Sequence, residues 1–199
     1  SYMSLDHINA QQALQRLKEG NERFRSNLQS KDCCSQRRQE LLTKGQTPFA
    51  VILGCSDSRI PPEVIFDQAL GDIFVIRVAG NVVSAIELGS IEYGVEHLHT
   101  PLLVILGHDN CGAVKATVDG GEAPGSIGAI VDMIKPSVEK AKAAGASGDD
   151  LYEKACEENL WAMLAIVKQS PIIEEMVAHG HLEIVLAKYL QNSGEVVFF

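Results

Sequence analysis

Residues 49–54 read Phe-Ala-Val-Ile-Leu-Gly, and residues 55–59 continue with Cys-Ser-Asp-Ser-Arg. A short apolar run without alternation is typical of a strand that is buried on both faces of a sheet. Two further runs, at 73–78 and 102–107, are also rich in Val, Ile and Leu and are bounded by Gly or Pro. These runs predict the central strands of a parallel sheet.

Segments of helical character alternate with these strands. Apolar residues recur at helical spacing over 8–27, and a shorter helix is predicted over 39–44. Later in the chain we expect helices over 84–98, 127–144 and 150–169, a helix with Pro171 in its first turn, and strands over 181–190 and 196–199 separated by a turn at Ser193-Gly194.

The alternation of strands and helices predicts one α/β domain. We expect a mainly parallel central sheet of four strands plus a C-terminal edge strand, with helices on both faces. Residues 1–45 are predicted to form an N-terminal helical arm, and residues 46–199 the α/β domain. The amphipathic helix that precedes the sheet favours at least a dimer.

Composition narrows the class of protein. The 199 residues carry a net charge of -9 and are 46% hydrophobic, which is enough for one globular domain with a substantial core. No basic run is present to neutralise phosphates, and no apolar stretch is long enough to span a bilayer, so we expect neither nucleic acid nor membrane as a partner.

The five cysteines and the N-terminus bear on location. An odd number of cysteines argues against a disulfide framework, and any cysteine that binds a metal as a thiolate must stay reduced. Both points favour a reducing, cytoplasmic compartment. The N-terminus carries no signal-peptide pattern, although a removed signal or transit peptide would leave the same start. We interpret Cys33 and Cys34 as ordinary thiols and Cys156 as part of a helix buried in the core.

Candidate zinc ligands follow two of the predicted strands. Cys55 ends the first strand, and His108 and Cys111 follow the third. Ligand sites in α/β sheets collect at the carboxyl ends of the strands, which would bring these residues together. Two thiolates and one imidazole leave a fourth zinc position open, as in catalytic rather than structural zinc sites.

Asp57 and Arg59 lie in the loop that leaves the first strand. An Arg side chain can hold a carboxylate through two parallel hydrogen bonds. The alternative is an ordinary surface ion pair that contributes little. Their place beside a metal ligand favours a catalytic role for both residues.

Cys55, Asp57 and Arg59, together with Gly-His-Asp-Asn-Cys-Gly at 107–112, resemble the signature of the β-class carbonic anhydrases, in particular the plant-type branch. The resemblance extends through Phe-Val-Ile-Arg-Val-Ala-Gly-Asn at 74–81 and Ile-Glu-Tyr at 91–93. It implies a zinc enzyme that interconverts carbon dioxide and bicarbonate. It also implies a homodimer or a dimer of dimers in which the N-terminal helices embrace the partner subunit. Residues 1–45 would then be a dimerisation arm, and residues 46–199 the zinc-binding catalytic domain.

The implied chemistry agrees with the residue types. Zinc lowers the pKa of bound water, so that hydroxide, the nucleophile toward carbon dioxide, forms near neutral pH. Two thiolates cancel the charge of the ion, and we therefore expect activity to rise toward alkaline pH. Held by Arg59, the Asp57 carboxylate can orient the hydroxide; released from Arg59, it could ligate zinc and close the site.

The resemblance also implies a substrate pocket. Gln46 matches an active-site glutamine that hydrogen-bonds a substrate oxygen, and the Gly112 amide could donate to bicarbonate. Phe74, Ala79 and Tyr93 resemble pocket-wall residues, which suits a nonpolar substrate. Packing in the core is an equally good interpretation of Phe74, and a helix N-cap is the alternative for Gly112.

One departure from the family concerns regulation. Members with a second, inhibitory bicarbonate site share a Trp three residues before the first Cys ligand, where this chain has Ile52. We therefore predict no inhibition by bicarbonate through that site.

Two other functions stay open at this level. The same zinc site could hydrolyse carbonyl sulfide or carbon disulfide, because hydroxide would attack the same kind of linear carbon centre. A noncatalytic zinc-binding protein would instead use Asp57 as a permanent fourth ligand.

Overall fold

The computed structural model describes residues 8–30 and 35–199, which form an α/β fold around one five-stranded sheet. The sheet has the order β2-β1-β3-β4-β5; the first four of these strands are parallel and β5 runs antiparallel to β4. The predicted parallel sheet of four strands with a C-terminal edge strand is therefore confirmed. The strands are β1 (Ala50–Gly54), β2 (Ile73–Arg77), β3 (Leu102–His108), β4 (Glu183–Leu190) and β5 (Glu195–Phe198).

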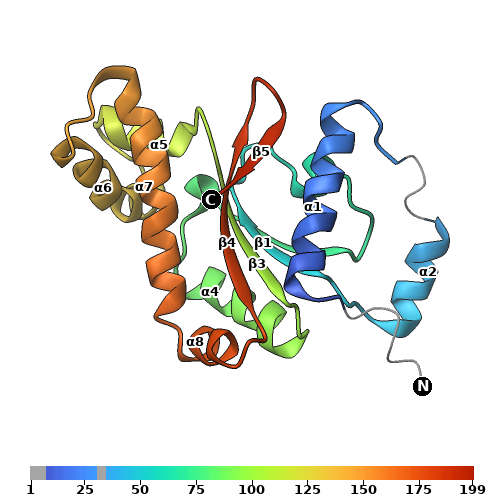
Figure 1. Cartoon of the computed structure of the whole chain (residues 1–199). Helices are drawn as coiled ribbons and strands as arrows, with labels where there is room; N and C mark the ends of the chain where they lie inside the picture. The colour runs from blue at the N-terminus through green and yellow to red at the C-terminus, as the bar shows by residue number, and fades with distance from the viewer. Residues whose placement is uncertain (1–7, 31–34) are drawn as a thin grey trace.

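Helices cover both faces of the sheet, as predicted (Figure 1). One face packs against α1 (Ala10–Arg25) and the short α3 (Pro62–Ile65). The opposite face packs against α4 (Ala85–Glu92), α5 (Gly112–Asp119), α6 (Ile127–Ala143), α7 (Gly148–Lys168) and α8 (Pro171–Ala178). The remaining helix, α2 (Ser35–Lys44), lies beyond α1, away from the body of the sheet (Figure 1).

The apolar runs explain which strands are central. Every residue of β1 and of β3 is buried, because each strand has neighbours on both sides and helices on both faces. β2 lies at an edge and is only half-buried. The carboxyl ends of β1 and β3 therefore lie side by side at one end of the sheet, where the predicted metal ligands follow.

The helix α1 is part of the fold of this chain. Asn9 and Gln12 form a capping box at its start, and Ala13 and Leu17 are fully buried against the sheet. Gly20 lets α1 lie close to the backbone that follows α3, because a Cβ there would lie 1.7 Å from the carbonyl oxygen of Phe66. Within the predicted arm, α1 thus supplies part of the core of this chain; the role of residues 1–45 in dimerisation stays a prediction.

Several local elements differ from the sequence-based expectation. The helix predicted over 84–98 ends its α-helical part at Glu92 and continues as a π-helical turn over Tyr93–His97. α3, α5 and the 3-10 turn Ala79–Asn81 were not predicted. They are too short to carry a clear periodic pattern, and tertiary packing determines them. In the described part of the chain, no helix combines the length and the apolar character that a membrane crossing requires.

Candidate metal centre

Cys55, His108 and Cys111 converge at the carboxyl end of the sheet. Cys55 follows β1, His108 ends β3, and Cys111 is the N-cap of α5. One ligand atom from each lies within 4.8 Å of the others, and this is the one such group of three found among the described residues. All three residues are buried, with exposed fractions of 6%, 2% and 4%.

The orientation of the His108 ring leaves one nitrogen for a metal. Its Nδ1 lies 2.6 Å from the carbonyl oxygen of Asp109, which can only accept a hydrogen bond, so Nδ1 carries the proton. The Nε2 atom is buried, and no hydrogen-bond partner exists for it within residues 8–30 and 35–199. A buried nitrogen lone pair without a partner beside two thiols is what a zinc ligand set requires.

The thiols of Cys55 and Cys111 differ in pKa. A hydrogen bond from Cys111 lowers the pKa of the Cys55 thiol to about 4, while the same contact raises the pKa of Cys111. The backbone N–H of Gly80 also donates to Cys55 Sγ at 3.3 Å. A bound cation would stabilise both thiolates, so the donor set fits zinc, with its preference for sulfur and nitrogen.

Asp57 and Arg59 form the bidentate pair that the sequence predicts. Arg59 Nε donates to Asp57 Oδ1 at 2.9 Å and Nη2 to Oδ2 at 2.7 Å, and the Arg59 amide adds a third bond to Oδ1 at 2.9 Å. The hydrogen bond from the guanidinium lowers the pKa of Asp57 to about 2. Asp57 Oδ2 lies 4.0 Å from His108 Nε2, so the ionised carboxylate is beside the ligand atoms.

The loop that follows β1 is held by contacts with Arg77, Gly80 and Asn110. Arg77 donates from Nε to the carbonyl of Cys55 at 2.8 Å and from Nη2 to the carbonyl of Asp57 at 2.6 Å. Arg59 Nη2 also donates to the Asn110 carbonyl at 3.3 Å, which joins the loop after β1 to the loop after β3. Arg77 had a sequence signal, as the one charged residue in an apolar strand, but Gly80 and Asn110 act through their backbone, which no side-chain motif reveals.

The expected pocket residues divide into two groups. Ala79 begins the turn whose Gly80 amide reaches Cys55, and Gly112 follows Cys111 as the first residue of α5. Both therefore lie beside the ligand atoms. Apart from its chain neighbours and the backbone of α5 itself, no described heavy atom lies within 4 Å of a Cβ built on Gly112, so the space on that side of Gly112 is open.

Gln46, Phe74 and Tyr93 lie toward the other end of the sheet in this chain. Gln46 is exposed and precedes β1, whereas Cys55 follows it. Phe74 pairs with Val51, roughly 13 Å along the strand from Cys55 at about 3.3 Å per residue. Its ring contacts Tyr93 with centroids 5.9 Å apart, and Tyr93 is 45% exposed.

The remaining cysteines are not members of the group of three or lie outside the described residues; the Cys156 thiol contacts the backbone of Cys111. Cys156 is 7% exposed in α7, as predicted for a core residue, and burial raises the pKa of its thiol to about 12. Cys33 and Cys34 lie outside the described residues.

Comparison with known proteins decides the family. The family model described as carbonic anhydrase matches residues 50–196. The chain belongs to the carbonic anhydrase family. It is 41% identical over 197 residues to carbonic anhydrase 2 of Mycobacterium tuberculosis, covering 97% of this chain and 94% of that protein.

Several solved structures that resemble this chain are β-carbonic anhydrases. A tetrameric β-carbonic anhydrase of Sordaria macrospora superposes with a TM-score of 0.76 at 26% identity, covering 83% of this chain and 87% of that one. The Coccomyxa β-carbonic anhydrase, in complex with acetazolamide, gives 0.74 at 31% identity, covering 92% and 85%. The predictions of a β-class carbonic anhydrase and of an enzyme of that kind are confirmed; the plant-type branch stays a prediction.

Proposed function

We propose that this enzyme catalyses the zinc-dependent, reversible hydration of carbon dioxide to bicarbonate and a proton. The observation that carries the proposal is the buried group of Cys55, His108 and Cys111, in which His108 Nε2 has no hydrogen-bond partner among the described residues, with an ionised Asp57 beside it. Zinc held by these three residues would acidify water and so supply hydroxide near neutral pH.

Asp57 and Arg59 provide the orientation that the reaction requires. Arg59 holds both carboxylate oxygens of Asp57; Oδ1 already accepts two hydrogen bonds, whereas Oδ2 accepts one and keeps a lone pair that can accept a hydrogen bond from the attacking oxygen. The depressed pKa keeps Asp57 an acceptor at any physiological pH. Engagement of Asp57 by Arg59 also supports the catalytic interpretation over a structural site, in which Asp57 would be a ligand.

We infer that the substrate pocket is completed by a second copy of the chain. Ala79 and Gly112 lie beside the ligands, whereas Gln46, Phe74 and Tyr93 lie toward the far end of the sheet near the edge strand β2. Only a partner subunit could bring these three to a metal centre. The tetrameric relative from Sordaria macrospora supports a homodimer or a dimer of dimers.

The proposed arm of residues 1–45 offers a surface for that contact. Leu42 of α2 is 86% exposed, and Leu70, next to Gly71 against which α2 packs, is 44% exposed. Exposed apolar side chains on neighbouring segments favour a protein–protein interface. The carboxyl-terminal unit 46–199 then holds the zinc site, in line with the family match from residue 50 onward.

Zinc content and stopped-flow hydration of carbon dioxide test the function. We expect the wild type to bind one zinc per chain and to be active, and Cys111→Ser to lose both zinc and activity. Asp57→Ala should keep zinc and lose activity by about a hundredfold, the scale of a lost orienting contact. Cys156→Ala is the matched control, because Cys156 lies outside the ligand set, and it should keep both.

The same variants separate the alternatives. Loss of zinc in Asp57→Ala would make Asp57 a ligand and indicate a structural site. A zinc-loaded wild type that hydrolyses carbon disulfide but does not hydrate carbon dioxide would establish the hydrolase in its place.

A further inference from the structure

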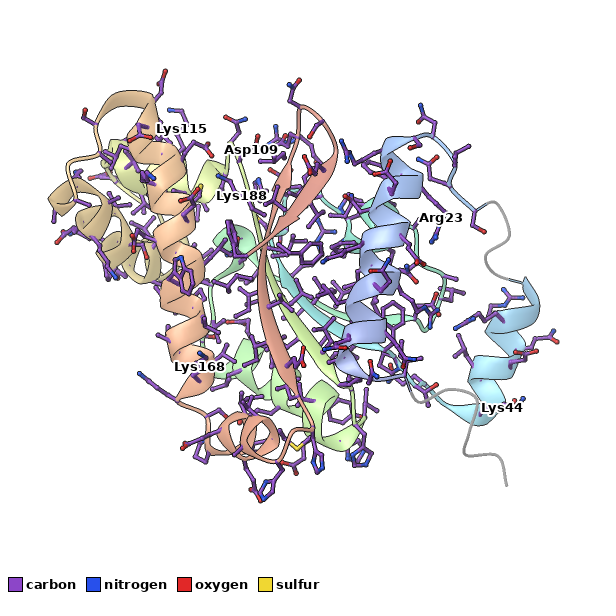
Figure 2. All side chains as sticks on the ribbon, in the orientation of Figure 1. Arg23, Lys44, Asp109, Lys115, Lys168 and Lys188 are labelled. Carbon is purple, nitrogen blue, oxygen red and sulfur yellow. The ribbon has the colours of Figure 1, made fainter. Side chains whose placement is uncertain are left out.

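We propose that Gln191 is a positioning residue for His108, acting through the carbonyl group of Asp109. Gln191 is the first residue after β4 and lies 82 positions from Asp109 in the sequence. Figure 2 shows Asp109 at the end of the sheet where the β4–β5 hairpin turns. The inference rests on the proposed zinc site and names a residue outside the expected ligand and pocket residues.

The contact that carries the proposal is a shared acceptor. Gln191 Nε2 donates to the Asp109 carbonyl oxygen at 2.7 Å, and His108 Nδ1 donates to the same oxygen at 2.6 Å. A carbonyl oxygen has two lone pairs, so one is occupied by the imidazole and the other by the Gln191 amide. The Gln191 side chain thereby fixes the group that orients the His108 ring.

Two further hydrogen bonds hold Asp109 in place. Its side-chain Oδ1 accepts the backbone N–H of Gln191 at 3.0 Å, and its own N–H donates to the carbonyl of Tyr189 at 3.2 Å. The peptide between His108 and Asn110 is therefore attached to β4 and to the residue that follows it. A carbonyl group held in this way cannot rotate away from the imidazole.

The hairpin that carries Gln191 is itself anchored. Asn21 of α1, which is 5% exposed, donates to the Gly194 carbonyl at 2.8 Å and accepts from the Val196 amide at 2.9 Å. The turn that carries Gln191 is therefore held to α1 where it enters β5, and it is not a free loop. Groups behind a metal-ligating histidine that fix its tautomer and ring orientation typically change metal affinity 10- to 100-fold when they are removed.

The test is zinc affinity, measured by competition with a chromophoric chelator on the full-length protein. Gln191→Met keeps the length of the side chain and removes its donor, and we expect its dissociation constant for zinc to be about 10- to 100-fold higher than that of the wild type. Asn192→Ala, an exposed neighbour in the same turn, is the control and should bind zinc as the wild type does. The near-UV circular dichroism spectra of the zinc-saturated proteins should be the same.

Gln191→Glu is a second variant, equal in size but without the donor, and it should weaken zinc binding in the same range. A dissociation constant within threefold of the wild type in either variant overturns the proposal, and so does equal weakening in Asn192→Ala. Failure of both Gln191 variants to fold also overturns it, because Gln191 would then serve the fold and not the ligand. A wild type that does not bind zinc would refute the proposed zinc site itself, which is a different result.

Discussion

Replacing Gly80 with alanine perturbs the backbone that faces the metal ligands. Gly80 has a φ of 73°, in the left-handed region that an L-residue occupies at a cost of roughly 1–2 kcal/mol. Its amide donates to Cys55 Sγ, and its carbonyl accepts from Asn159 Nδ2 at 2.9 Å. The segment therefore cannot relax without loss of these contacts.

Packing adds to the cost. The new Cβ would lie 2.7 Å from Ile134 Cδ1 and 3.2 Å from Ala113 Cβ. The Ile134 methyl group ends a flexible side chain, but Ala113 has no rotamer to change. Overpacking of this kind costs roughly 1–3 kcal/mol, so we expect Gly80→Ala to lower the free energy of unfolding by about 2–5 kcal/mol in total.

Urea unfolding in the presence of excess chelator measures this effect without a contribution from zinc. Gly89→Ala is the matched control, because Gly89 lies in α4 with no described heavy atom within 4 Å of a built Cβ, and it should gain about 0.5–1 kcal/mol. A Gly80→Ala protein whose free energy of unfolding equals that of the wild type would refute the reasoning about both the backbone and Ala113.

Three further predictions concern the ion pair, the hairpin and the pH profile. Arg59→Leu should raise the pKa of Asp57 from about 2 toward its ordinary value. Because that pKa is depressed in the folded wild type, the stability lost in Arg59→Leu should be constant above about pH 4 and should shrink as the pH falls toward 2, as followed by urea unfolding. Asn21→Leu should cost roughly 3 kcal/mol or more, since each of the three buried backbone groups left without a partner costs about 1–3 kcal/mol; unchanged hydrogen exchange of the Val196 amide would contradict this. Carbon dioxide hydration should rise toward alkaline pH, because zinc held by Cys55 and Cys111 as thiolates would acidify its bound water less than zinc held by neutral imidazoles; a flat stopped-flow profile would count against it.

The sheet was predictable because its signals are local. Residues 49–54 and 102–107 are apolar without alternation, and this pattern alone indicates strands buried on both faces. Short elements such as α3 and the turn at Ala79–Asn81 have too few residues for such a signal, and packing determines them.

The candidate site was predictable in part for the same reason. Cys55, His108 and Cys111 are residue types with metal chemistry, and each follows a strand whose carboxyl end could be placed from the order of elements. Gln46 and Phe74 were expected to line a pocket from the family resemblance. The predicted strand at 49–54 separates Gln46 from Cys55, but only the register of β1 and β2 shows that Phe74 also lies toward the far end of the sheet in its own chain.

The sequence by itself determined the kinds of donor, their order and the strand ends that carry them, because these depend on residue type and on patterns a few residues long. Only the tertiary structure decided which His108 nitrogen is free, that the Gly80 amide points at Cys55 Sγ, and that Gln191 shares an acceptor with His108. Those features depend on backbone groups and on contacts between residues as far as 82 positions apart. Backbone N–H and C=O groups are the same at nearly every residue, so their roles appear only when the chain is folded.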